Sequence, residues 1–149
     1  MGNGEKFIRY YSLLAGIAFT IAGIGGFIGG ITQPMAADAP HLMVEANYGL
    51  LLGLFPVNIL HNIFHLAIGI GGLLTFRNTA QARRFLQVFG VALIILTIMG
   101  LIPQLNTTFG LVPLFGHDIW LHGLEGIIAL YLVFAVKPEP ASIITKMTI

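Results

Sequence analysis

Two histidines in matching sequence contexts are the residues of this chain best suited to chemistry. His65 lies nine residues after the proline of a Gly-Leu-Phe-Pro segment at 53–56, and His122 lies nine residues after the proline of a Gly-Leu-Val-Pro segment at 110–113. Each histidine stands in a long apolar run. Neutral imidazole is a strong nitrogen ligand and a proton acceptor, so such histidines can bind a porphyrin or a metal ion, or relay a proton. Ionisable groups within a membrane are functional candidates by default.

The match between the two segments extends into an internal repeat. Residues 53–76 and 110–133 are identical at seven of 24 positions without a gap, and a glycine, Gly69 or Gly126, follows each histidine by four residues. The histidines lie about 13 Å into their helices, near the midplane of a bilayer core of about 30 Å. We therefore expect two equivalent helices that run in the same direction, as parallel repeats about an axis along the membrane normal.

Further polar residues share a helical face with each histidine, because they follow i, i+3 or i+4, i+7 spacing. They are Asn58, His61, Asn62 and His65 in the first segment, and Asp118, His122 and Glu125 in the second. A charged residue at the centre of a membrane helix costs about 2.5–3.5 kcal/mol, which favours pairing. We therefore expect the two polar faces to meet across the bundle interior.

Four roles are open for these side chains. His65 and His122 could hydrogen-bond between helices and fix their register, or could be axial ligands of haem or chlorophyll. A metal site could be built from His61, His65, His122 and Glu125. A proton or quinone site could use His122 and Glu125. If it binds no metal, His61 is expected to be solvated near the outer surface, as is His117. His41 is expected to be a solvated loop residue.

The composition is that of a membrane protein. Hydrophobic residues make up 56% of the 149 residues and charged residues only 9%, against about 25% charged in soluble domains. The mean hydropathy is +0.90. Four apolar runs approach the length of about 20 residues that crosses a bilayer, at 12–31, 57–76, 85–102 and 114–136. They predict an all-α, four-helix transmembrane bundle of two parallel-repeat hairpins, forming a single integral membrane domain over 1–149.

The basic residues predict the orientation of this bundle. All seven fall on one side of the expected spans: Lys6, Arg9, Arg77, Arg83, Arg84, Lys137 and Lys146. Because cytoplasmic loops are enriched in lysine and arginine, both termini should lie in the cytoplasm or on the stromal side. This places the protein in a bacterial inner membrane or a thylakoid membrane. The net charge of +1 argues against a nucleic-acid partner.

Two segments predict how the bundle is packed and covered. A small residue recurs every four positions in the first span, at Ala18, Ala22, Gly26 and Gly30. Such a stripe allows close helix approach, either within this bundle or to a second copy or another membrane subunit. Between the first two spans, residues 41–55 are expected to form a short amphipathic helix at the outer interface.

The first polar segment resembles a known family. Asn62-Ile63-Phe64-His65-Leu66-Ala67-Ile68-Gly69, preceded by Val57-Asn58 and His61, resembles the Asn-x-x-His-x-x-x-Gly signature of small four-helix bacterial and cyanobacterial membrane proteins grouped as domain of unknown function 4383. The second copy, with His122 and Gly126, resembles their fourth helix, although Ile119 replaces the asparagine. The resemblance implies a four-helix membrane fold with family-type positions at Asn62, His65, Gly69, His122 and Gly126, and it implies no activity.

These observations favour a non-enzymatic membrane protein, because no nucleophile, phosphate-loop or zinc-protease motif is present. We expect an accessory or scaffold subunit of a larger complex, photosynthetic or respiratory. The alternatives are a haem- or chlorophyll-binding protein and a protein that transports protons or small solutes.

Overall fold

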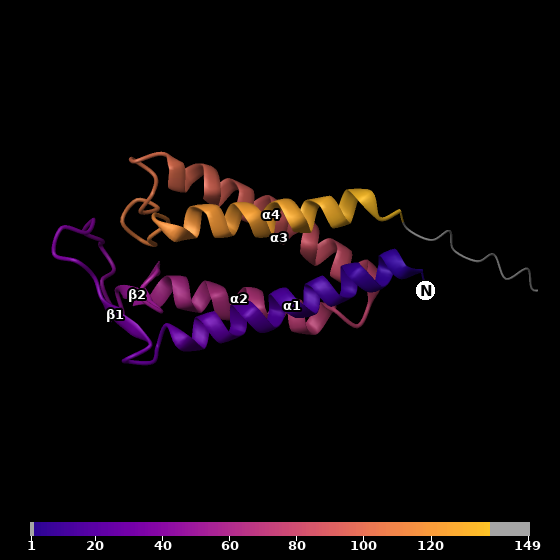
Figure 1. Ribbon diagram of the computed structural model, residues 1–149, viewed down its shortest axis with the longest axis horizontal. Coiled ribbons are helices and arrows are strands. Elements are labelled where there is room, and N and C mark those ends of the chain that lie inside the picture. Colours follow the sequence, from indigo (N-terminus) through magenta and orange to yellow (C-terminus); the bar gives the residue numbers. More distant parts are fainter. Residues whose placement is uncertain (1, 138–149) are drawn as a thin grey trace, which may run out of the picture.

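The computed structural model describes residues 2–137 and confirms the all-α bundle. Its helices are α1 (Asn3–Gly25), α2 (Ile59–Thr75), α3 (Thr79–Leu101) and α4 (His117–Ala135). Two helical hairpins, α1 with α2 and α3 with α4, lie side by side (Figure 1). Three helices, α1, α3 and α4, are long and apolar enough to cross a membrane, and α2 is apolar but has only 17 residues. The chain is therefore a membrane protein by the length and composition of its helices.

Both hairpins are held by close contact between helix backbones at glycines. A Cβ atom on Gly72 of α2 would lie 2.8 Å from Gly16 Cα of α1, and one on Gly126 of α4 would lie 3.1 Å from Gly90 O of α3. In the first hairpin Ser12 Oγ also donates a hydrogen bond to Gly72 O at 3.1 Å. Glycine allows this approach because it has no side chain, and close packing is the main attraction between helices in lipid.

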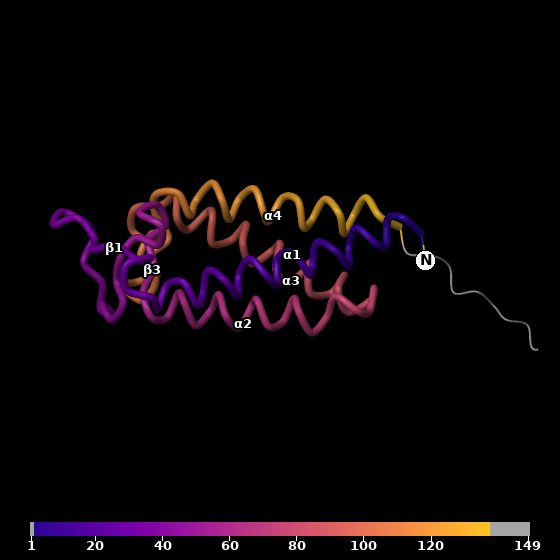
Figure 2. The backbone as a smooth tube through the Cα atoms, turned by 60° about the horizontal axis from the view of Figure 1, so that its bottom comes forward, coloured from indigo at the N-terminus to yellow at the C-terminus, as the bar shows by residue number. Residues whose placement is uncertain are grey.

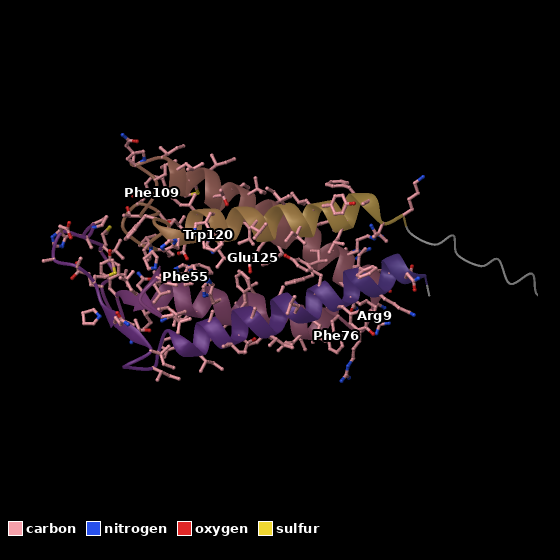
Figure 3. The ribbon with its side chains drawn as sticks, in the orientation of Figure 1. Arg9, Phe55, Phe76, Phe109, Trp120 and Glu125 are labelled. Carbon is pink, nitrogen blue, oxygen red and sulfur yellow. The ribbon has the colours of Figure 1, made fainter. Side chains whose placement is uncertain are left out.

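The ends of the two hairpins are also built alike. Arg9 Nε of α1 donates to Phe76 O, at the end of α2, at 2.8 Å (Figure 3). Arg83 Nη1 of α3 donates to Val133 O, in the last turn of α4, at 2.5 Å. Arg9 precedes Arg83 by 74 residues, as Gly16 precedes Gly90, and Phe76 precedes Val133 by 57 residues. In each hairpin an arginine thus binds a carbonyl group at a helix end, where the carbonyl groups lack partners within the helix.

The hydrophobic core lies where the two hairpins meet. It is formed by residues of α1, α3 and α4, with Phe19 of α1 in edge contact with Phe89 of α3 at 5.2 Å between ring centroids. Phe85 stacks on Phe89 at 5.5 Å. The core side chains are Ile8, Ala15, Phe19, Ala82, Leu86, Phe89, Leu93, Ala129 and Val133.

A small antiparallel sheet covers one end of the bundle, which we call the sheet end (Figure 2). Its strands are β1 (Thr32–Pro34), β2 (Gly49–Leu51) and β3 (Phe55–Val57), in the order β1-β2-β3. Gln33 pairs with Leu50, and Leu50 pairs with Pro56. The expected amphipathic helix over 41–55 is wrong. Gly49 must lie against Gln33 O, where a Cβ atom would come within 2.5 Å, and Gly53 turns the chain with a φ of +71°.

The helix ends differ most from expectation in α1. It begins at Asn3 instead of residue 12, because the helix continues through polar residues such as Lys6 and Arg9 that precede the apolar run. It ends at Gly25 instead of residue 31, and the glycines that follow turn the chain into β1, with Gly30 at a φ of +92°. α3 likewise begins at Thr79 instead of residue 85, where the Asn78 side chain accepts a hydrogen bond from Gln81 N at 3.0 Å.

Candidate functional site

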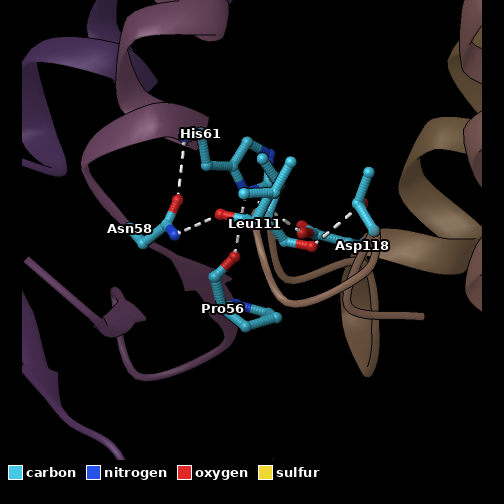
Figure 4. A network of polar contacts seen from close by, with 7 residues as sticks. Pro56, Asn58, His61, Leu111 and Asp118 are labelled. Atoms are coloured by element: carbon cyan, nitrogen blue, oxygen red, sulfur yellow. Dashed lines mark hydrogen bonds and ion pairs between the residues drawn. The ribbon is translucent and has the colours of Figure 1, made fainter. Parts of the chain in front are cut away.

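The start of α2 is fixed by Asn58, which is fully buried at the sheet end. Its Oδ1 accepts a hydrogen bond from His61 N at 2.9 Å and so caps the helix. Its Nδ2 donates to Val44 O at 2.8 Å and to Leu111 O at 2.7 Å (Figure 4). Because Val44 and Leu111 belong to the connections of the two different hairpins, this one side chain joins both connections to the helix that carries His61 and His65.

His61 is buried and points into the bundle, so its expected solvation at the outer surface is wrong. Only 3% of the residue is exposed. Its Nδ1 lies 3.1 Å from Pro56 O and 3.8 Å from Asp118 Oδ2 of α4 (Figure 4). A carbonyl oxygen can only accept, so Nδ1 carries the hydrogen and donates it. In neutral His61 this leaves Nε2 as the nitrogen with a free lone pair.

Three histidines from the two hairpins meet at this point. The ring centroid of His61 lies 4.3 Å from that of His65 and 6.0 Å from that of His122. One ring nitrogen of each can be chosen so that all three lie within 4.8 Å of one another. We call His61, His65 and His122 the histidine cluster. Its members come from α2 and α4, so the predicted meeting of the two polar faces is what the structure shows.

Several polar atoms beside the cluster have no hydrogen-bond partner among the described residues. They are His65 Nδ1, Asp118 Oδ2 and both polar atoms of the Asn62 side chain. Asn62 is fully buried, and Asp118 is 2% exposed. A buried polar group without a partner costs about 1–3 kcal/mol, so such atoms usually mark a functional site or a place for a bound ligand.

A cavity of about 470 Å³ adjoins the histidine cluster between α1 and α4. Four polar residues, His65, Asp118, His122 and Glu125, line it, and the rest of its wall is apolar. The apolar wall consists of Ala18, Phe19, Ile21, Ala22, Gly25, Ile31, Leu51, Leu52, Phe55 and Leu121. Phe55 and Glu125 lie between the two hairpins (Figure 3). The volume falls in the range of about 300–1,000 Å³ that is typical of ligand pockets.

The expected small-residue stripe divides between different environments. Ala18 and Ala22 line the cavity, where their small side chains leave space. Gly26 lies directly after α1 and against Asn62, because a Cβ atom there would overlap the Asn62 side chain. Gly30 is exposed and lies in the turn before β1. The close contact between α1 and α2 uses Gly16 instead, because Gly16 lies on the face of α1 that meets α2.

The other expected site residues lie at or near the cluster. A Cβ atom on Gly69 would meet the backbone N of Thr20 in α1 at 2.6 Å, so this glycine allows close helix approach, as Gly126 does in the other hairpin. Glu125 lines the cavity but does not belong to the histidine cluster. His117 is exposed at the sheet end, where its Nδ1 accepts a hydrogen bond from Trp120 Nε1 at 2.9 Å. His41 is exposed, as expected for a loop residue.

Two parts of the site were not named from the sequence. The Pro56 carbonyl that orients His61 could not be predicted, because every residue has a backbone carbonyl and the residue type does not show which one binds a side chain. The pairing of His61 with Asp118 could have been inferred, because these residues are 57 positions apart and therefore occupy equivalent places in the repeat that the sequence predicts.

The fold and the site define a four-helix membrane protein with a buried histidine cluster beside an apolar cavity. A family model described as a domain of unknown function (DUF4383) matches residues 9–135, and the chain belongs to this family, as its resemblance predicted. No curated protein and no solved structure matches the chain.

Proposed function

We propose that this protein binds a transition-metal ion at the histidine cluster. The observation that carries the proposal is the convergence of three imidazole nitrogens within 4.8 Å, on two helices of different hairpins. Imidazole is a good ligand for zinc, copper, nickel and iron ions. In a tetrahedral zinc site with bonds of about 2.0–2.1 Å, ligand nitrogens are about 3.4 Å apart, so an ion would draw the ring nitrogens closer together by up to about 1.4 Å.

The surroundings of the cluster support an ion at this place. The Nδ1 of His61 is held by the Pro56 carbonyl, which directs Nε2 to a ligand, as outer hydrogen bonds do in known metal sites. A divalent ion bound by three neutral imidazoles needs negative charge nearby in a membrane interior. Asp118, 3.8 Å from His61, and Glu125 in the cavity wall are placed to supply it.

A haem or chlorophyll bound by His65 and His122 together is less favoured than an ion. The two ring centroids are 6.4 Å apart, but the ring of His61 lies 4.3 Å and 6.0 Å from them. It therefore stands beside the gap into which a flat macrocycle would have to enter. Ligation by a single histidine, His65 or His122, is the remaining form of this alternative, and a visible absorption band of the purified protein would reveal it.

The experiment is metal analysis of the full chain, purified in mild detergent without a histidine tag. We expect about one ion per chain after exposure to Zn²⁺ or Co²⁺, with the absorption bands of four-coordinate Co²⁺. His65→Gln should weaken binding by more than the roughly 10- to 100-fold that loss of an outer partner costs. His117→Gln removes an exposed histidine of α4 and should leave binding unchanged. Equal binding by wild type and His65→Gln would refute the proposal.

We further propose that the protein acts as an accessory subunit of a larger membrane complex, with the sheet end facing away from the cytoplasm. The basic residues Arg9, Arg77 and Arg83 lie at the opposite end, which supports this orientation. Single-cysteine labelling in intact cells tests it: a cysteine at exposed position 109 should react with an impermeant reagent, and one at exposed position 84 should not. Migration in mild detergent as a lone chain would contradict the accessory role.

A further inference from the structure

The cavity beside the histidine cluster has an apolar wall, a polar inner end and an opening toward the membrane. We propose that it binds an isoprenoid quinol, with the ring hydroxyl groups at the polar end and the isoprenoid tail directed into the bilayer. This inference concerns a second ligand and does not require the metal ion.

The opening lies on a part of the protein that faces lipid. Ile21 of α1 and Leu52 after β2 both line the cavity, and 65% and 64% of these residues are exposed. α1 is long and apolar enough to cross the membrane. Ile21 is therefore both exposed on this helix and part of the cavity wall, which provides an entrance for a molecule dissolved in the bilayer. A ligand that enters here must carry an apolar tail.

The charges of the wall exclude an anionic headgroup. Asp118 and Glu125 line the cavity, and no lysine or arginine of residues 2–137 does so. Apart from the imidazoles of His65 and His122, a phosphate or a fatty-acid carboxylate would meet two acids and no basic side chain, and burying unpaired like charges is costly. The ligand therefore has a neutral polar group, which separates a quinol from phospholipids and fatty acids.

The inner end of the cavity requires hydrogen-bond donors. Asp118 Oδ2 and His65 Nδ1 are buried and have no partner among the described residues, and both residues line the cavity. A carboxylate oxygen only accepts, and His65 Nδ1 accepts in the neutral tautomer that carries its hydrogen on Nε2. The two hydroxyl groups of a quinol can donate to these atoms. The rings of Phe19 and Phe55 in the wall suit a flat aromatic ring, because aromatic rings pack well in offset or edge contacts.

The single tryptophan provides the assay. Trp120 is the only tryptophan of the chain, and its ring centroid is 6.4 Å from that of Phe55, a residue of the cavity wall. The full chain in lipid nanodiscs is titrated with decylubiquinone and with its reduced form, and Trp120 fluorescence is recorded. We expect weak but saturable quenching by the quinone, and its displacement by the quinol at lower concentrations, because only the quinol can donate to Asp118 Oδ2 and His65 Nδ1. Quenching that rises without saturation, or displacement by added phospholipid alone, would overturn the proposal.

Two variants of α1 separate the cavity from the lipid around it. Ala22→Phe places a large side chain in the cavity and should weaken binding by at least about tenfold. Ile24→Phe adds an aromatic ring at an exposed position outside the wall and should bind as wild type does. Ala18→Leu replaces Ala22→Phe if the latter does not fold, as judged by its helical circular dichroism. Equal binding by the cavity variant and its control would refute the site.

A third variant tests the polar end, and a second readout separates the two ligands. Asp118→Leu removes the acceptor Oδ2 and should weaken quinol binding about fivefold, the effect of one lost hydrogen bond of about 1 kcal/mol. The Zn²⁺ content of Ala22→Phe should equal that of wild type, because the substitution leaves the histidine cluster unchanged. Wild-type protein that binds Zn²⁺ but neither form of decylubiquinone would refute the quinol site alone, and the reverse result would refute the metal site alone.

Discussion

Replacement of Gly72 by alanine should open the first hairpin. The new Cβ atom would lie 2.7 Å from Ser12 O and 2.8 Å from Gly16 Cα. Both neighbours are backbone atoms, so α1 and α2 would have to separate by about 0.6–1 Å to restore ordinary contact, and overpacking of this kind costs about 1–3 kcal/mol. The separation would also lengthen the hydrogen bond of 3.1 Å from Ser12 Oγ to Gly72 O.

The adjacent glycine is a matched control for this substitution. A Cβ atom on Gly71 would meet only the Phe85 side chain, at 3.3 Å from Cε2. Both substitutions gain about 0.8–1.0 kcal/mol of helix propensity, so their difference isolates the helix contact. Unfolding of the two variants by sodium dodecyl sulfate in mixed micelles should show Gly72→Ala less stable than Gly71→Ala by about 1–3 kcal/mol. Equal free energies of unfolding would refute the conclusion that backbone contact at this glycine holds α1 to α2.

Two further predictions concern residues that fix helix ends, and the same unfolding titration measures both. Asn58→Ala removes a helix cap and two further part-buried hydrogen bonds, and should cost about 2–4 kcal/mol, whereas Asn78→Ala removes only an exposed cap worth about 1 kcal/mol. Equal losses would contradict the joining role of Asn58. Arg83→Lys should lose about 1 kcal/mol, because one ammonium nitrogen replaces the two guanidinium nitrogens that bind Val133 O and Val136 O, while Arg84→Lys, at an exposed position, should lose nothing measurable. A stable Arg83→Lys protein would show that the double contact contributes little.

The four helices and the meeting of the two polar faces could be predicted, because the sequence patterns that indicate them extend over many residues. Apolar runs near the length of a bilayer mark the spans, and His65 and His122 stand at the same distance from a proline. The sheet end could not be predicted in this way. Strands of three residues such as β2 carry no usable periodicity, and glycines such as Gly49 are compatible with a turn, a strand or a helix end.

The burial of His61 depends on contacts that no local pattern encodes. Residues of both hairpin connections, including Val44 and Leu111, close over the start of α2, and Asn58 binds both carbonyl groups. From the sequence, His61 stands near the end of its span and is expected to meet water. Only the way in which the two connections fold together removes it from water and places it next to His65 and Asp118.

The facing positions of His61 and Asp118 have a consequence for how such a site can arise. If two identical hairpins associated as separate chains, each residue near their shared axis would face a copy of itself: a histidine would face a histidine, and an aspartate an aspartate. With both hairpins in one polypeptide, the two positions can hold different residues, and here a base faces an acid while His65 still faces His122. Two hairpins in one polypeptide can therefore place an unequal pair beside a pair of histidines, which two copies of a single hairpin could not encode.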